Sequence, residues 1–216
     1  MSDSGSTRQQ IFDRIRGATP AAASVSYKTV PRRYLRSGSL SREPKLALMA
    51  ERLRDYDVDL IACLPHTLTE AIASQVEASG RRRLIVPENF PREWLTSRID
   101  YLVDRHLSVA EVGQVEGVIT AAFCGIADSG TIALHHSSTE GRRLLTLLPD
   151  WHLIILRASQ VVETLPEYFD RCDQPPVLAT YISGPSATSD IEMTRVKGVH
   201  GPRTLSVVLV EDEIPT

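Results

Sequence analysis

Apolar positions in the first half of the chain alternate between helical spacing and short continuous runs. Residues 44–56 place apolar side chains three or four positions apart, which predicts a helix. Residues 59–64 and 83–86 each begin with one charged residue and continue as an apolar run, as buried strands of parallel sheets do. Between them, Thr67 and Glu70 have the spacing of a capping box, and Gly80 predicts where that helix ends. Helix–strand–helix–strand order indicates a right-handed parallel crossover.

The second half continues this order in shorter segments. Ser108 and Glu111 predict another capped helix, and the apolar run 117–127 ends at a turn beginning with Asp128. Further strands are predicted at 131–134, 151–156, 178–183 and 205–210, and further helices at 140–148, at 160–171 and from Ser189 onward. We therefore expect an α/β fold of the Rossmann-like three-layer α/β/α type, with a largely parallel sheet and helices on both faces.

The first 43 residues follow a different pattern. Residues 1–7 are polar and predict disorder, whereas residues 8–16 place Ile11, Phe12 and Ile15 on one face of a short helix. Residues 18–41 show neither period and mix tyrosines with basic residues, which predicts an extended arm. This divides the chain into a helix and basic arm, 1–43, and one domain, 44–216. The arm could lie across its own body or across a partner subunit, so a homo-oligomer is left open.

Composition narrows the function classes. The chain has 216 residues with 24 basic and 27 acidic side chains, a net charge of −3, which gives no case for nucleic acid or an anionic membrane. The basic arm is short and unrepeated, which favours docking over nucleic-acid contact. No apolar run approaches about 18 residues, so no membrane span is expected. The polar N-terminus lacks the apolar core of a signal peptide, which indicates a cytoplasmic protein.

Cysteine and histidine spacing argues against a metal site. Cys63, Cys124 and Cys172 form no C-x-x-C pair, so we expect buried thiols and neither a disulfide framework nor an iron–sulfur cluster on this chain. His135 and His136 are adjacent and would point to opposite sides of an extended chain. No metal and no cofactor is therefore assigned to this chain.

The first candidate binding loop follows the strand at 178–183. In open α/β sheets, ligands bind where loops leave the carboxyl ends of strands, and glycine lets the backbone approach a ligand. Amides at the start of a following helix would suit a phosphate or carboxylate. The candidate residues of this loop are Ser183, Gly184, Pro185, Ser186, Asp190 and Glu192. Asp190 and Glu192 would repel an anion unless a metal or sugar hydroxyls intervene, and Ser189 with Glu192 also fits a capping box.

Two further loops complete the candidate site. His200 and Gly201 lie in a Gly-rich turn before the last strand, where an imidazole could act as acid, base or hydrogen-bond donor. The turn Asp128, Ser129, Gly130 and Thr131 is an ordinary turn by itself and becomes a candidate if it lies beside the other two loops. Arg142 or Arg143 could hold a substrate carboxylate, although such pairs usually form a solvated face.

Three stretches resemble the lactate utilization protein C family, whose members contain a LUD domain. They are GVITAAFCGIADSGTIAL, GRRLLTLLPDWHLIIL and YISGPSATSDIEMTRVKGVHGPRTLSVVLV, and the ordered set SGPS-x-T-x-DIE…GVHGP is the most specific. The resemblance implies a domain similar to the NagB/RpiA/CoA transferase-like fold. It also implies a subunit that supports oxidation of L-lactate to pyruvate with iron–sulfur partner proteins, which would carry the clusters. Asp128-Ser129 stands where the family often has Glu-Thr, a change compatible with a different ligand.

These observations leave three hypotheses. The first is a non-cluster subunit of a lactate-oxidising system that binds a small anionic ligand at the three loops. The second, by fold analogy, is a stand-alone enzyme acting on a phosphorylated or CoA-thioester small molecule. The third is a non-catalytic scaffold whose basic arm recruits partners. The sequence contains no G-x-G-x-x-G, P-loop, H-E-x-x-H or G-x-S-x-G motif, and it identifies no catalytic residue.

Overall fold

The computed structural model describes residues 4–19, 26–97, 99–189, 195–197 and 201–212. The chain divides into two compact units, Met1–Tyr34 and Leu35–Thr216. The first unit contains helix α1 (Ser4–Ala18) and a short 3-10 helix, η1 (Tyr27–Thr29). Helix α1 begins at Ser4, so the prediction of disorder through residue 7 is wrong for residues 4–7. The apolar face predicted for this helix is exposed in the described structure.

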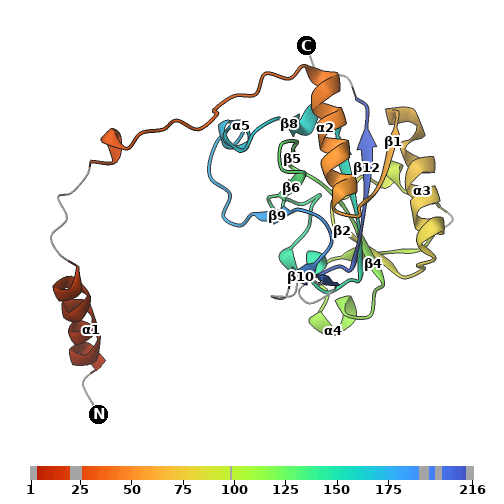
Figure 1. Cartoon of the computed structure of the whole chain (residues 1–216). Helices are drawn as coiled ribbons and strands as arrows, with labels where there is room; N and C mark the ends of the chain where they lie inside the picture. The colour runs from red at the N-terminus through yellow and green to blue at the C-terminus, as the bar shows by residue number, and fades with distance from the viewer. Residues whose placement is uncertain (1–3, 20–25, 98, 190–194, 198–200, 213–216) are drawn as a thin grey trace. The chain divides into compact units, whose positions relative to one another are not determined.

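A six-stranded parallel sheet forms the centre of the second unit (Figure 1). Its strands are β1 (Asp59–Cys63), β2 (Leu84–Pro87), β3 (Tyr101–Asp104), β4 (Gly117–Ala121), β7 (Trp151–Arg157) and β12 (Thr204–Val210). They lie in the order β1-β12-β7-β4-β2-β3, and every neighbouring pair is parallel. The α/β class with a largely parallel sheet is therefore confirmed.

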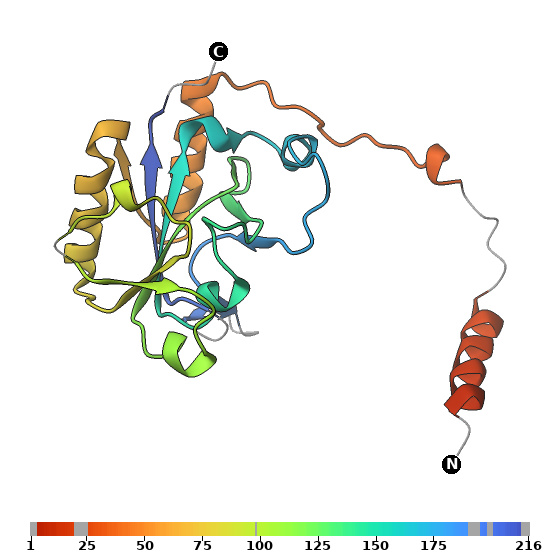
Figure 2. The same cartoon turned by 180° about the vertical axis from the view of Figure 1, so that it is seen from behind.

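Helices cover both faces of this sheet (Figures 1 and 2). Helix α3 (Leu68–Ser79) packs Ile72 against one face, in a cluster that includes Leu153 of β7. Helix α2 (Arg42–Asp55) packs Leu53 against the other face, in a cluster that includes Ile154. Consecutive residues of a strand point to opposite faces, so Leu153 and Ile154 place the two helices on opposite sides.

A second, four-stranded sheet lies on the α2 side and was not predicted. It has the order β8-β5-β6-β9 and mixes one parallel with two antiparallel pairings. Its strands are β5 (Cys124–Ile126), β6 (Thr131–Leu134), β8 (Val161–Val162) and β9 (Thr180–Ile182). Ile132 and Leu134 join the cluster of Ile154, which shows how the sheets pack together. The apolar run 117–127 is thus two strands in different sheets.

The short helices were predicted with mixed success. Helix α4 (Val109–Val112) has the predicted capping box of Ser108 and Glu111, and Gly80 ends α3 with a φ of 68°. The hydroxyl of Thr67 instead donates to the carbonyl of Leu64 at 3.1 Å, so it does not cap α3. The predicted helices at 140–148 and 160–171 shrink to the 3-10 helix η4 (Arg143–Thr146) and to helix α5 (Leu165–Asp170). Two further 3-10 helices are η3 (Arg92–Trp94) and η5 (Ala158–Gln160), and η2 (Pro65–Thr67) precedes α3.

The prediction of a helix from Ser189 onward is wrong. Strands β10 (Ala187–Ser189) and β11 (Arg195–Lys197) pair antiparallel as a two-stranded sheet. The amides of a helix start are therefore not available to an anion at this position. Asp190, Glu192 and His200 lie outside the described residues. Within the described part of the chain, no helix is long and apolar enough to cross a membrane.

Candidate functional site

A cavity of about 150 Å³ lies between β9, the loop that follows it, and the starts of strands β7 and β12. It is lined by Arg143, Thr146, His152, Thr180, Tyr181, Ile182, Ser183, Gly184, Pro185, Ser186, Gly201, Pro202 and Leu205. His152 and Leu205 are the second residues of β7 and β12, so the cavity is at the amino ends of these strands. The sequence predicts the ligand site at the carboxyl ends of the strands, but these loops meet at the amino ends of β7 and β12.

The structure brings the described parts of the three loops together. Five residues of the candidate site line the cavity: Ser183, Gly184, Pro185, Ser186 and Gly201. The amide of Ser186 donates to the carbonyl of Pro202 at 2.8 Å, which joins the first loop to the second. The hydroxyl of Thr131 lies 2.8 Å from the hydroxyls of both Ser183 and Ser129, which joins the third loop to the first. Thr131 thus supports the lining residue Ser183, and Ser129 supports Thr131, although neither lines the cavity itself.

Asp128 and Gly130 contact helix α2 and are not among the residues that line the cavity. The side chain of Arg52 donates from Nε to the carbonyl of Asp128 at 3.3 Å. Gly130 has a φ of 62°, and a Cβ placed there would lie 2.6 Å from Cβ of Arg52. This turn is therefore shaped by its packing on α2, in addition to its hydroxyl contacts with Ser183.

Gly184 has the same relation to the end of α2. Its φ is 85°, and a Cβ at this position would lie 2.7 Å from Cβ of Tyr56. A left-handed backbone and a close neighbour both require glycine here. The Cα position of Gly184 at which another residue would carry a Cβ thus faces Tyr56, the C-cap residue of α2. The backbone of Gly184 borders the cavity.

His152 is the most deeply placed polar residue of the lining and was not singled out in the sequence. Its side chain is buried, and Nε2 lies 2.8 Å from the hydroxyl of Thr120 on β4. Burial lowers the pKa of His152 to about 3, so the imidazole is neutral at neutral pH. A single imidazole within the apolar strand 151–157 was the available signal, because a buried polar group requires a partner.

The two adjacent arginines have different roles. Arg142 forms a two-point ion pair with the buried carboxylate of Asp104, with Nε–Oδ2 at 2.7 Å and Nη2–Oδ1 at 2.8 Å. These hydrogen bonds raise the pKa of Arg142. Arg143 instead lines the cavity and donates to the hydroxyl of Thr146 at 2.9 Å. Arg143 is therefore the arginine placed to meet a ligand carboxylate or phosphate.

His135 and His136 form hydrogen bonds with different partners. His136 bonds the hydroxyl of Thr180 at 2.7 Å through Nε2 and the carbonyl of Gly141 at 2.8 Å through Nδ1. His135 bonds the hydroxyl of Tyr168 at 2.7 Å, and burial lowers the pKa of this imidazole. Both imidazoles thus serve as hydrogen-bonding supports for β9 and its surroundings.

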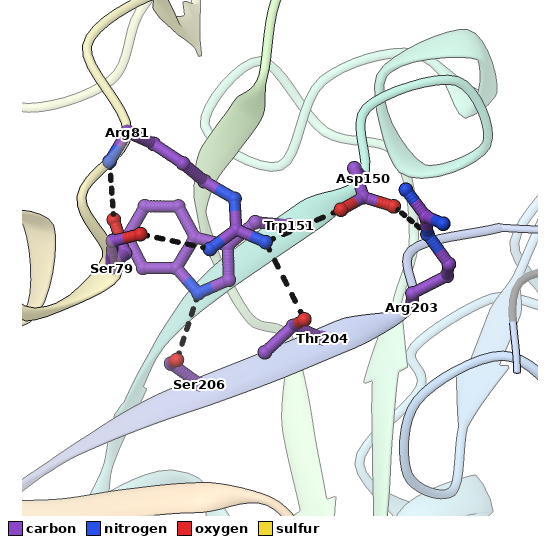
Figure 3. A network of polar contacts seen from close by, with 7 residues as sticks. All are labelled: Ser79, Arg81, Asp150, Trp151, Arg203, Thr204 and Ser206. Atoms are coloured by element: carbon purple, nitrogen blue, oxygen red, sulfur yellow. Dashed lines mark hydrogen bonds and ion pairs between the residues drawn. The ribbon is translucent and has the colours of Figure 1, made fainter.

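A polar network on the α3 side fixes the starts of β7 and β12 (Figure 3). Asp150 accepts from Arg81 at 3.3 Å and also from Arg203, and Trp151 donates to the hydroxyl of Ser206 at 2.8 Å. The guanidinium of Arg81 lies 5.6 Å from the ring centre of Trp151. Partial burial raises the pKa of Asp150, but the hydrogen bonds from the two arginines outweigh it, and the pKa is lowered. This network anchors the residues that directly follow the Gly201–Pro202 turn.

The lining can hold a small anion. Among the described lining residues there is one cation, Arg143, and no carboxylate. The hydroxyl of Ser183 could donate to a ligand oxygen, whereas the hydroxyl of Thr146 already donates to the carbonyl of Arg143 at 3.0 Å. His152 adds a neutral imidazole that can donate or accept a hydrogen bond. The arrangement therefore favours recognition of a compact, oxygen-rich anion.

Comparison with known proteins identifies relatives that cover about four fifths of the chain. The LUD domain family matches residues 103–210. Lactate utilization protein C of Deinococcus radiodurans is 40% identical over 178 residues, which cover 79% of this chain and 82% of that protein. Lactate utilization protein C of Halalkalibacterium halodurans is 36% identical over 189 residues, which cover 80% of this chain and 81% of that protein.

A solved structure agrees with this relationship. The crystal structure of a DUF162 family protein from Deinococcus radiodurans superposes with a TM-score of 0.67 and 35% sequence identity, covering 80% of this chain and 99% of that chain. Identity and coverage at these levels extend the likeness beyond the fold to the sequence. The chain belongs to the LUD domain family, as do its relatives named lactate utilization protein C.

Proposed function

We propose that this chain is a subunit of a lactate-utilization system that supports oxidation of L-lactate to pyruvate. Its relatives named lactate utilization protein C support a role in lactate utilization. The proposal includes iron–sulfur partner proteins that carry the electron-transfer clusters, and a cytoplasmic location for the system. Within the described residues, no three His, Cys, Asp or Glu side chains group as a metal site would require.

The cavity at the three loops is the proposed binding site for a small anionic ligand. The observation that carries this proposal is the combination of Arg143 with hydroxyl groups in a described lining that has no carboxylate. The guanidinium would pair with the anion, and the hydroxyl of Ser183 would donate to one of its remaining oxygens. His152 would form a hydrogen bond with an uncharged oxygen of the ligand, since its imidazole is neutral.

A thermal-shift experiment on the purified chain tests this site. L-lactate, pyruvate, inorganic phosphate, sugar phosphates and coenzyme A thioesters would be compared at matched ionic strength. A ligand at about 100 times its Kd should stabilise the chain by about 2.7 kcal/mol, or a few degrees in Tm. We expect the shift with lactate or pyruvate to be lost in Arg143→Gln and kept in Arg92→Gln, a control arginine on η3 outside the lining.

Other outcomes would change the proposal. Stabilisation only by phosphorylated or thioester compounds would favour a stand-alone enzyme of the kind suggested by fold analogy. No shift with any of these compounds would refute ligand binding at the cavity and leave a scaffolding subunit. L-lactate-dependent reduction of an electron acceptor by the chain with its iron–sulfur partners, and not by the chain alone, would support the subunit role.

A further inference from the structure

The first unit exposes an apolar helix face. On α1, Ile11, Phe12 and Ile15 are 54%, 43% and 55% exposed. A helix of 15 residues is marginal in water by itself, and most of the stability of such helices comes from packing an apolar face against another surface. Three large apolar side chains on one face therefore indicate that α1 has a docking partner.

The second unit exposes an apolar surface of its own beside α5, which we name the α5–β9 surface. It consists of Leu165, Phe169 and Tyr181, which are 48%, 56% and 48% exposed. Leu165 and Phe169 are one turn apart on α5. The rings of Phe169 and Tyr181 both contact the buried ring of Tyr168, with centroid separations of 5.0 Å and 5.6 Å, which places Tyr181 of β9 next to α5.

The start of the second unit is already bound next to this surface. The amide of Gly38 donates to Glu167 at 3.0 Å, and the amide of Leu40 donates to Glu163 at 2.6 Å. A Cβ on Gly38 would lie 2.1 Å from the side chain of Glu163, so glycine is needed for this close passage. The carboxylates at the amino end of α5 therefore hold the backbone of residues 38–40 beside Leu165.

The two units carry net charges of opposite sign. Residues 1–34 contain six basic and two acidic side chains, a net charge of +4. The remaining 18 basic and 25 acidic side chains give residues 35–216 a net charge of −7. Locally, α1 carries Arg8, Arg14 and Arg16 with one carboxylate, Asp13, and the exposed Asp170 and Asp173 follow Phe169 in the sequence with Arg171 between them. An apolar contact between such surfaces would be reinforced by opposite charge.

We propose that α1 of one copy docks on the α5–β9 surface of a second copy, so that two copies exchange their first units. The contact continues the interface that residues 38–40 already form with the start of α5. Exchange in both directions gives two identical contacts related by a twofold axis, which closes the assembly as a dimer. This proposal is independent of any ligand in the cavity.

Light scattering with size-exclusion chromatography of the full chain tests the exchange. We expect a dimer whose Kd rises at least about tenfold, equivalent to about 1.4 kcal/mol, in Phe12→Glu and in Phe169→Glu. Val109→Glu changes another exposed apolar residue, on α4, and should remain dimeric. Higher salt should weaken the dimer because the units carry opposite charge. Unchanged circular dichroism and thermal unfolding would show that each variant folds.

Mixing the two variants distinguishes exchange from other arrangements. The Phe12→Glu chain keeps an intact α5–β9 surface, and the Phe169→Glu chain keeps an intact α1. An equimolar mixture should therefore recover a heterodimer through one contact, with different masses or labels on the two chains to identify it. A monomeric wild-type chain, a dimer insensitive to both variants, or a mixture that recovers no heterodimer would each overturn the proposal. A monomer whose α1 resists protease until either residue is changed would instead show docking within one copy.

Discussion

Acidification should weaken the fold through His152, and a substitution at this residue should remove that part of the weakening. The imidazole is buried against Thr120, and its pKa in the folded chain is about 3. An unfolded histidine has a pKa of about 6.5. Between these two pH values the unfolded chain therefore binds a proton that the folded chain does not. Stability from this residue is complete above about pH 6.5 and falls as the pH drops toward about 3.

The size of the effect follows from the separation of the two pKa values. Each pH unit below about 6.5 costs about 1.4 kcal/mol of stability until the folded pKa is reached. Moving from about pH 7 to about pH 5 should therefore lower the free energy of unfolding by about 2 kcal/mol through His152. In His152→Gln, the side-chain amide can replace Nε2 as the hydrogen-bond partner of Thr120. Unlike the imidazole, this amide does not bind a proton between about pH 7 and about pH 5. The variant should lose about 2 kcal/mol less than the wild type over the same interval.

Urea unfolding followed by tryptophan fluorescence measures this difference. Both chains would be unfolded at about pH 7 and about pH 5, and the change in unfolding free energy would be compared between them. His66→Gln makes the same replacement at an exposed position and should retain the wild-type loss. Equal losses in the wild type and His152→Gln would refute the reasoning, because burial would then not be holding this imidazole neutral.

Two further substitutions test the packing around the site. Gly184→Ala should cost about 1–3 kcal/mol more than Gly80→Ala in urea unfolding, because both glycines have positive φ but only Gly184 meets α2 at close range; equal costs would contradict the close approach. Asp104→Asn should cost about 2 kcal/mol, since it removes a buried charged partner from the two hydrogen bonds of Arg142, a side chain that is 35% exposed. Asp55→Asn, in an exposed ion pair, should cost under about 0.5 kcal/mol in the same assay, and a similar cost at Asp104 would show that its burial adds nothing.

The central strands could be predicted because their apolar runs are bounded by turns and helices. The segments that became β1, β7 and β12 were each marked by a continuous run. Strand β3 was missed because it is a four-residue edge strand with partial burial along its length. The break after β4 could not be seen, since burial in the first sheet and burial in the second produce the same apolar sequence. Apolarity reports burial, and it does not say which sheet a strand joins.

The residues around the cavity could be predicted only in part, for a related reason. Small polar residues and glycines marked the loops, and the hydroxyl contact of Thr131 with Ser183 confirms that two of those loops meet. His152 was missed because the sequence does not show to which face of the sheet its side chain points. Only the assembled sheets show that it borders a cavity. The helix expected from Ser189 fitted a local capping pattern, but pairing of β10 with β11 overrides that pattern. Local signals located the loops, and tertiary contacts decided their form.

The contact of Gly130 and Gly184 with helix α2 links parts of the sequence that are far apart. Each glycine lies against a side chain of α2, Arg52 or Tyr56, with no room for a methyl group between them. Homologues should therefore show correlated changes in volume, in which a larger residue at 184 is accompanied by a smaller one at 56. The variability of the candidate loops is in this way restricted by a helix that takes no part in the lining, and engineering of the loops would have to begin by redesigning α2.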